Sequence, residues 1–173
     1  MSEPVGNNKS DLVLAELKKR KAQKSVVDVE EKKMKVVIFS LRGELFAFSG
    51  ENVKEILPLA NIYPVPGTPD YIPGVVNIRG EIESVVTMNG FLGLPESERS
   101  SASRIAVAQK EGVRSGFLVD SVTDVTDIPV SLVKPPLNTL AKAQKEFVAG
   151  EFFYQNKNII LLDLGKIFVK ITS

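Results

Sequence analysis

The chain has 173 residues, of which 43% are hydrophobic and 25% charged, and its formal net charge is +1. It contains no cysteine and no histidine, which excludes disulfides, thiolate metal sites and the commonest general base near neutral pH. We therefore expect a globular protein that is not an enzyme, holds no metal or cofactor, and lacks an overall field that attracts nucleic acid. A helix that spans a membrane needs about 18 apolar residues, and no apolar run in this sequence approaches that length. The N-terminus lacks the apolar core of a signal peptide, so we expect a cytoplasmic location.

Residues 1–33 differ in composition from the rest of the chain. Ser10 or Asp11 is a candidate cap for a short helix through "LVLAELKKRKAQK", whose apolar residues form no wide stripe. The cations in this stretch repel one another: Lys18, Lys19, Arg20, Lys21 and Lys24. We interpret residues 1–33 as a basic tail that is partly helical or disordered. The alternative is a basic element that touches an acidic partner, a membrane surface or nucleic acid.

From residue 35 the apolar period changes to two, which is typical of strands. "KVVIFSL" and "ELFAFS" form a predicted hairpin with the turn at Arg42-Gly43-Glu44. Both faces of the first strand are apolar, with Val36 and Ile38 on one and Val37, Phe39 and Leu41 on the other. This pattern predicts a strand covered on both sides, as in a closed barrel with something packed outside it.

The next segment is extended and rich in proline. "TPDYIPG" predicts a one-turn helix, with Thr68 as its N-cap and Gly74 just past its end. A second hairpin follows, "VVNI" and "IESVVTM", with the turn at Arg79-Gly80-Glu81. Residues 95–104 are polar, and we interpret them as a linker between a first half at about 35–95 and a second half at about 104–170.

Two more hairpins are predicted in the second half. "RIAVAQ" and "VRSGFLVDSV" flank a Lys-Glu-Gly turn, and "GEFFYQ" and "NIILLDL" turn at Asn156-Lys157. Between them, residues 138–150 have room for a helical turn or two, and a short helix over 164–171 closes the chain. Many short strands with turn signals at regular spacing predict an all-β fold, either a barrel or a sandwich.

Three carboxylates, Asp120, Asp124 and Asp127, lie close together in the sequence. Their spacing does not match a calcium loop, so we interpret them as polar residues at a strand edge. Binding is then the remaining role. The two Arg-Gly-Glu turns differ in the strand that leads into them. Arg79 lies on the same strand face as the polar residue Asn77, whereas Arg42 continues an apolar face.

Four segments in order resemble the CheW-like domain, the coupling protein of bacterial chemosensory arrays. "TPDYIPGVVNIRGEI" is similar to that family's Thr-Pro-x-x-Ile/Phe-x-Gly-Val-x-Asn-Leu-Arg-Gly signature. The other three are "VVIFSLRGELFAFSGENVKEIL", "GFLVDSVTDVTDI" and "FVAGEFFYQNKNIILLDLGKIF". The resemblance covers about residues 35–168 and leaves the first 33 residues outside it.

The resemblance implies a fold of two intertwined, five-stranded barrels of the Src-homology-3 (SH3) type with short helices. It also implies a non-enzymatic adaptor that couples the cytoplasmic tip of a methyl-accepting chemotaxis receptor to the regulatory domain of the histidine kinase CheA. Contact with the membrane is then indirect, through receptors. The family's receptor contacts, carried over onto matching positions, fall on Val53, Glu55, Ile56, Gly74 and Arg79. An arginine beside an apolar groove can pair with Glu55 and donate to partner carboxylates.

One stretch departs from the family pattern. After the Arg-Gly turn the family reads Val-Pro-Val-x-Asp-Leu-Arg, whereas here Ser84 stands for the proline, Thr87 for the aspartate and Asn89 for the arginine. The departure raises two alternatives: an adaptor of a specialised, non-motility pathway, or a protein that binds one partner and competes with adaptors.

Overall fold

The computed structural model describes residues 12–18, 31–138 and 140–173. Contacts divide the chain into two units, Met1–Lys33 and Met34–Ser173. In the first unit, residues 12–18 are helical and exposed. The predicted caps Ser10 and Asp11, and the cations Lys19, Arg20, Lys21 and Lys24, lie outside the described residues.

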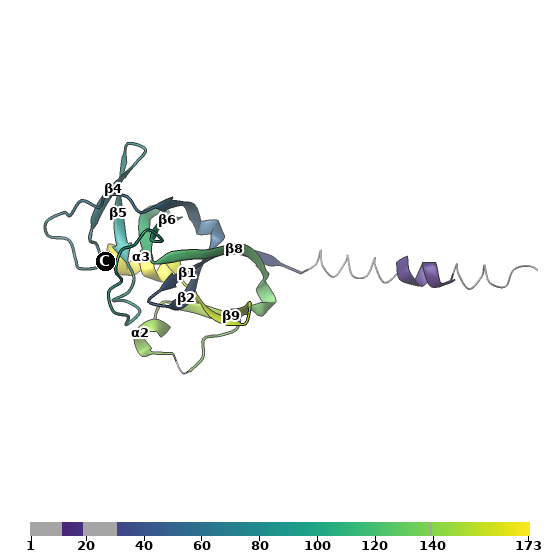
Figure 1. Cartoon of the computed structure of the whole chain (residues 1–173). Coiled ribbons are helices and arrows are strands. Elements are labelled where there is room, and N and C mark those ends of the chain that lie inside the picture. The colour runs from purple at the N-terminus through teal and green to yellow at the C-terminus, as the bar shows by residue number, and fades with distance from the viewer. Residues whose placement is uncertain (1–11, 19–30, 139) are drawn as a thin grey trace, which may run out of the picture. The chain divides into compact units, whose positions relative to one another are not determined.

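The second unit consists mainly of strands (Figure 1). They are β1 (Lys33–Leu41), β2 (Glu44–Ser49), β3 (Val53–Pro58), β4 (Gly74–Ile78), β5 (Glu81–Thr87), β6 (Arg104–Lys110), β7 (Val113–Val119), β8 (Ser121–Pro129), β9 (Val148–Tyr154) and β10 (Lys157–Leu162). The helices are short: η1 (Gly50–Asn52), η2 (Val130–Leu132), α2 (Lys142–Lys145) and α3 (Leu164–Thr172). Helix α2 confirms the helical turn predicted within residues 138–150, and α3 confirms the closing helix predicted over residues 164–171.

The strands form two five-stranded sheets, in the orders β8-β1-β2-β10-β9 and β3-β6-β7-β5-β4. The chain begins the first sheet with β1 and β2, builds the whole second sheet, and returns to complete the first. This arrangement confirms the all-β fold of two intertwined units. The polar residues 95–104 join β5 to β6, which are strands of the same sheet. The boundary predicted there is therefore not the boundary between the two sheets, because a polar connection marks an exposed loop and not a change of sheet.

Three apolar clusters fill the second unit. One is shared between the two sheets and includes Phe46, Met88, Phe117 and, from α3, Phe168. The other two each belong to one sheet, around Ile38 and Phe152 in the first and around Val76, Val85 and Ile105 in the second. Strand β1 contributes Ile38 to one cluster and Phe39 to the shared one, so it is covered on both faces as predicted.

All four antiparallel hairpins turn over two residues with positive φ. The pairs are Arg42-Gly43, Arg79-Gly80, Glu111-Gly112 and Gln155-Asn156. Positive φ at both central residues defines the type I′ turn, whose twist matches that of the flanking strands. In the first two turns glycine has the positive φ at the second position, and arginine has it at the first. The last turn lies one residue earlier than the predicted Asn156-Lys157, because Tyr154 pairs with Lys157.

Arg42 adopts the left-handed conformation, with φ of 52°. A non-glycine residue pays about 1 kcal/mol or more there, and asparagine tolerates it best. We expect Arg42→Asn to raise the free energy of unfolding by about 0.5–1 kcal/mol, because Asn-Gly is the preferred type I′ pair. Urea unfolding measures this, with Arg42→Ala as the control that removes the side chain without relieving φ. Equal stability of the two variants would contradict this explanation.

The one-turn helix predicted between the cap Thr68 and Gly74 is not a helix in the structure, which has a single hydrogen-bonded turn there. Ile72 N donates to Pro69 O at 2.9 Å, which closes one turn, and Pro73 has no N–H with which to continue it. The Thr68 hydroxyl donates to the carbonyls of Val65 and Ile72 instead of accepting from an N–H as a cap does. The segment is a tight loop that leads into β4.

Two of the three clustered carboxylates tie strands together. Asp120 Oδ2 accepts from the backbone N–H of Arg42 at 2.8 Å, and Asp124 Oδ2 accepts from the Tyr154 hydroxyl. The hydrogen bond to Asp124 raises the pKa of Tyr154 and keeps the phenol protonated as a donor between β9 and β8. The first bond also shows that the turn at Arg42 is anchored through its backbone, which leaves its side chain on the surface.

Candidate functional site

Four charged side chains lie in alternating sign at one end of the second sheet, and we call them the ion-pair chain. Arg79 Nη2 lies 3.0 Å from Glu55 Oε2, and Arg114 Nη2 lies 3.7 Å from Glu55 Oε1. Arg114 Nε lies 2.8 Å from Glu83 Oε1, as an ion pair without hydrogen-bond geometry. The pairing of Arg79 with Glu55 that we expected from the sequence is present, and Arg114 and Glu83 extend it inward.

Strand register explains why these four charges meet. Glu83 lies two residues before Val85 on β5, and Arg114 two residues before Gly116 on β7, and Val85 pairs with Gly116. Glu55 on β3 pairs with Val107 on β6. Residues two apart share a face, so these charges continue the face that carries the second sheet's apolar cluster. The ion-pair chain therefore closes the end of that core.

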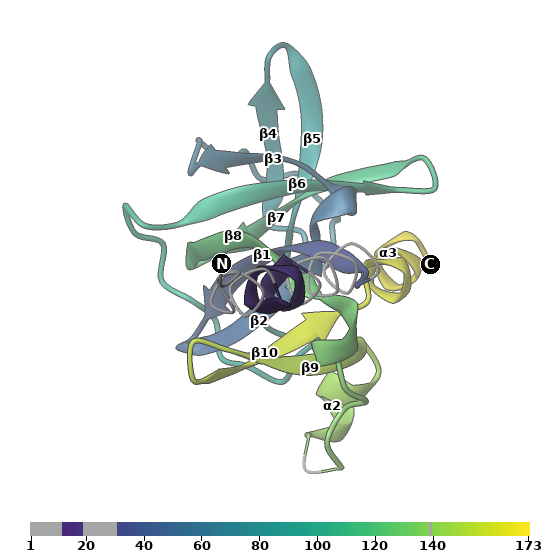
Figure 2. The same ribbon diagram turned by 90° about the vertical axis from the view of Figure 1, so that its right-hand side faces the viewer.

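Exposure increases outward along the ion-pair chain. The side chains of Glu83 and Glu55 are 11% and 18% exposed, whereas that of Arg79 is 78% exposed. Arg114 lies between the two carboxylates and compensates both, which a half-buried acid needs. Arg79 pairs with Glu55, and most of its side chain is in solvent. The pair orients the guanidinium, which can still donate hydrogen bonds to a partner protein. Figure 2 shows the β4–β5 hairpin rising beyond β3 and β6.

A β-bulge in β3 places Val53 and Ile56 on the same face of the strand. Val53 pairs with Ala108 and Ile56 with Ala106, with a register shift between Val53 and Glu55. Without the extra residue, positions 53 and 56 would face opposite sides. Both side chains are half-buried and lie on the face of the shared apolar cluster, to which Ala106 and Ala108 belong.

Gly74 is buried at the start of β4, beside the chain at Tyr63. Tyr63 and Val75 exchange backbone hydrogen bonds of 2.8 and 2.9 Å. A Cβ on Gly74 would lie 2.2 Å from the Tyr63 carbonyl oxygen, so only glycine admits this crossing. The close approach at Gly74 is therefore made by the protein's own backbone.

The five predicted site residues do not form one cluster. Glu55 and Arg79 are in contact, Val53 and Ile56 share the opposite face of β3, and Gly74 lies at the far end of β4 from Arg79. Sequence reasoning missed Arg114 and Glu83. Their signal was a charged residue among apolar ones: Arg114 is the single charge of "VRSGFLV", and Glu83 is the second of two glutamates in "EIESVVT".

The residues that depart from the family pattern all have partners. Ser84 Oγ lies 2.9 Å from Ser115 Oγ, and the Thr87 N–H donates to Tyr71 O. Asn89 is buried, and its Nδ2 donates to Pro95 O at 2.7 Å and to Ser97 Oγ at 2.9 Å. The side chains of Ser84 and Asn89 therefore take part in local hydrogen bonding, whereas Thr87 does so through its backbone N–H.

Within the described residues, no group of three or more acidic side chains is arranged to hold a metal ion. No helix in the described part of the chain is long and apolar enough to cross a membrane. What the region offers is an oriented arginine on a projecting hairpin and, on the opposite face of β3, half-buried apolar residues.

A two-sheet β protein that presents an oriented charge and half-buried apolar residues on its surface fits the class of binding and scaffolding modules. The CheW-like domain family model matches residues 35–172, and the chain belongs to that family. It is a chemotaxis-type scaffold, or adaptor.

Known relatives are similar over most of their length. The chemotaxis protein CheW of Thermotoga maritima is 31% identical over 82% of this chain and 91% of its own. The crystal structure of the scaffolding protein TtCheW from Thermoanaerobacter tengcongensis matches with a TM-score of 0.69 and 31% identity, over 77% of this chain and 86% of that chain. Protein PilI of Pseudomonas aeruginosa is 29% identical over 66% of this chain and 64% of its own.

Proposed function

We propose that this chain couples the cytoplasmic tip of a methyl-accepting chemotaxis receptor to the regulatory domain of the histidine kinase CheA. The observation that carries the receptor half of the proposal is the state of Arg79. It is held at 3.0 Å by Glu55, is 78% exposed, and lies at the tip of a projecting hairpin. An arginine fixed in this way donates to carboxylates or carbonyls on a helical receptor tip without losing much rotamer freedom.

The other proposed receptor residues contribute in two ways. Val53 and Ile56, brought to one face by the bulge, supply half-buried apolar surface of the kind that receives a helix face. Gly74 contributes by fixing Tyr63 against β4, and Tyr63 itself is 58% exposed. In this proposal the protein acts in the cytoplasm, uses no cofactor, and reaches the membrane only through receptors.

The direct test is assembly of the three proteins. We expect the full chain to co-elute with a receptor signalling-domain fragment and the kinase regulatory domain in one complex whose mass, measured by light scattering, includes all three. The reason is that a coupling protein must present two non-overlapping surfaces. Two partners that displace each other from this chain would contradict the proposal, and binding of neither would reject it.

A second candidate is an adaptor of a specialised pathway whose output is not motility. The observation that favours it is the set Ser84, Thr87 and Asn89, which replaces the family's usual residues in a stretch that the structure shows to be well bonded. A variant that competes with adaptors would lower kinase activity with the receptor present, whereas an adaptor raises it, so an assay of kinase activity separates the two.

A further inference from the structure

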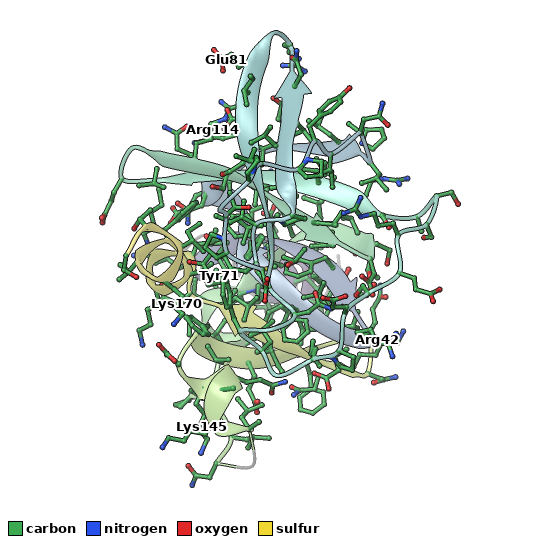
Figure 3. The ribbon with its side chains drawn as sticks, turned by 90° about the vertical axis from the view of Figure 1, so that its left-hand side faces the viewer. Arg42, Tyr71, Glu81, Arg114, Lys145 and Lys170 are labelled. Carbon is green, nitrogen blue, oxygen red and sulfur yellow. The ribbon has the colours of Figure 1, made fainter. Side chains whose placement is uncertain are left out.

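A cavity of about 460 Å³ lies at the end of the second sheet opposite to the ion-pair chain. It is bounded by Thr87 at the end of β5, by Leu118 near the end of β7, and by the segment that follows β5. Glu83 and Thr87 are four residues apart on β5, so the cavity and the ion-pair chain are separated by roughly 13 Å. In Figure 3, Tyr71, which lines the cavity, lies well below Arg114 and the hairpin at Glu81. The volume is within the range of ligand pockets, about 300–1,000 Å³.

Asn89 holds one wall of the cavity in place and leaves an acceptor inside it. The residue is 6% exposed, and its Nδ2 anchors the segment at Pro95 and Ser97. No group among the described residues donates to Asn89 Oδ1, although Asn89 lines the cavity. Because the amide nitrogen of Asn89 is occupied by these two bonds, its amide oxygen is the atom that is available to accept from a ligand.

The remaining lining is acidic and aromatic. Asp70, Glu96 and Asp120 contribute three carboxylates, against one cation, Arg99. Tyr71 and Phe91 lie with ring centroids 4.9 Å apart on the same cavity. Hydrogen-bond acceptors placed around two aromatic rings suit a planar cation with several N–H donors. A guanidinium has this shape and these donors, whereas an ammonium does not. The excess of carboxylates disfavours a ligand that brings its own carboxylate.

We propose that this cavity binds the side chain of an arginine presented by a partner protein. The guanidinium stacks on the Tyr71–Phe91 pair, donates to Asn89 Oδ1, and pairs with the surrounding carboxylates. The inference goes beyond the proposed function, because the site is separate from Arg79 and needs no receptor.

The probe for this site is N-acetyl-arginine-N-methylamide, titrated into the full chain and followed by amide and aromatic NMR shifts. We expect saturable shifts confined to the cavity, notably at Tyr71, Gly90 and Phe91. The neutral isostere N-acetyl-citrulline-N-methylamide is expected to bind at least tenfold more weakly. Equal binding of the two probes would overturn the proposal, since the charge would then be irrelevant. Free arginine that binds tenfold more tightly than the capped form would overturn the assignment to a partner protein.

Variants test whether the cavity itself is responsible. Asn89→Arg places an arginine of the chain's own in the cavity, and we expect it to weaken probe binding at least tenfold, whereas Asn158→Arg adds the same charge at an exposed position of β10 and has no effect. Should Asn89→Arg not fold, two exposed rim residues give the answer. Glu96→Gln is expected to weaken binding about threefold and Arg99→Gln to strengthen it about threefold, because they remove charges of opposite sign. Changes of the same sign in both would contradict the proposed site.

Discussion

Replacing Gly74 with alanine is expected to lower the free energy of unfolding by about 2–4 kcal/mol, the largest effect of a single methyl group that the fold predicts. The added Cβ would lie 2.2 Å from the Tyr63 carbonyl oxygen and 2.6 Å from its carbon, and both are backbone atoms. The crossing chain must move, and the two hydrogen bonds between Tyr63 and Val75 are then strained or lost. Urea or thermal unfolding measures the loss.

The matched control for this substitution is Gly90→Ala. A Cβ at Gly90 would meet nothing within 4 Å. We expect this variant to change stability by less than about 0.5 kcal/mol. If Gly74→Ala were as stable as Gly90→Ala, the crossing of Tyr63 over β4 would not be what requires glycine at position 74.

Replacing Arg79 with glutamate is expected to weaken binding of a receptor signalling-domain fragment by at least 30-fold, or about 2 kcal/mol, while the fold persists. The substitution puts a carboxylate where the proposal needs a donor, and next to Glu55. Stability changes little, because Arg79 is exposed and an exposed pair contributes only about 0–1 kcal/mol. Arg114 also remains 3.7 Å from Glu55 and keeps that carboxylate compensated.

Arg42→Glu is the internal control for this prediction. Arg42 and Arg79 occupy the same turn position with φ of 52° and 54°, each followed by glycine, and Glu111 occupies the third such turn with φ of 51°. Glutamate is therefore accommodated in this turn, and both variants change the charge equally. Titration calorimetry with the receptor fragment should show full affinity for Arg42→Glu. Equal losses of affinity in the two variants would mean that receptor binding depends on the net charge of the protein and not on the position of Arg79.

The strands and turns were predictable because their causes are local. Short apolar runs rich in β-branched and aromatic residues define β1 and β2, and Arg-Gly at residues 42–43 and 79–80 marks the two-residue turns. The one-turn helix expected after Thr68 is instead a turn within a loop, because the Thr68 hydroxyl bonds to carbonyls and does not accept from an N–H as a helix cap does. Such local patterns predicted the structure correctly where they fitted one element, as in the hairpins. They failed at Thr68, because threonine followed by proline is typical both of a helix N-terminus and of a loop.

The arrangement of the site was predictable only in part. The contact between Arg79 and Glu55 was expected, but the bulge that brings Val53 and Ile56 to one face leaves no trace in the apolar pattern. Arg114 meets Glu83 because β5 and β7 pair in parallel, which is a property of the sheet order. The cavity beside Asn89 depends on a loop held by two hydrogen bonds, and no spacing in the sequence encodes it.

The central claim, that this chain couples receptor to kinase through Arg79, is tested most directly by kinase activity. Autophosphorylation of the kinase is measured with the receptor fragment present, as increasing amounts of the wild-type chain, Arg79→Glu or Arg42→Glu are added. We predict that wild-type and Arg42→Glu raise the activity at least tenfold and that Arg79→Glu does not. Activity that falls as the wild-type chain is added, or that rises equally with Arg79→Glu, would contradict the claim.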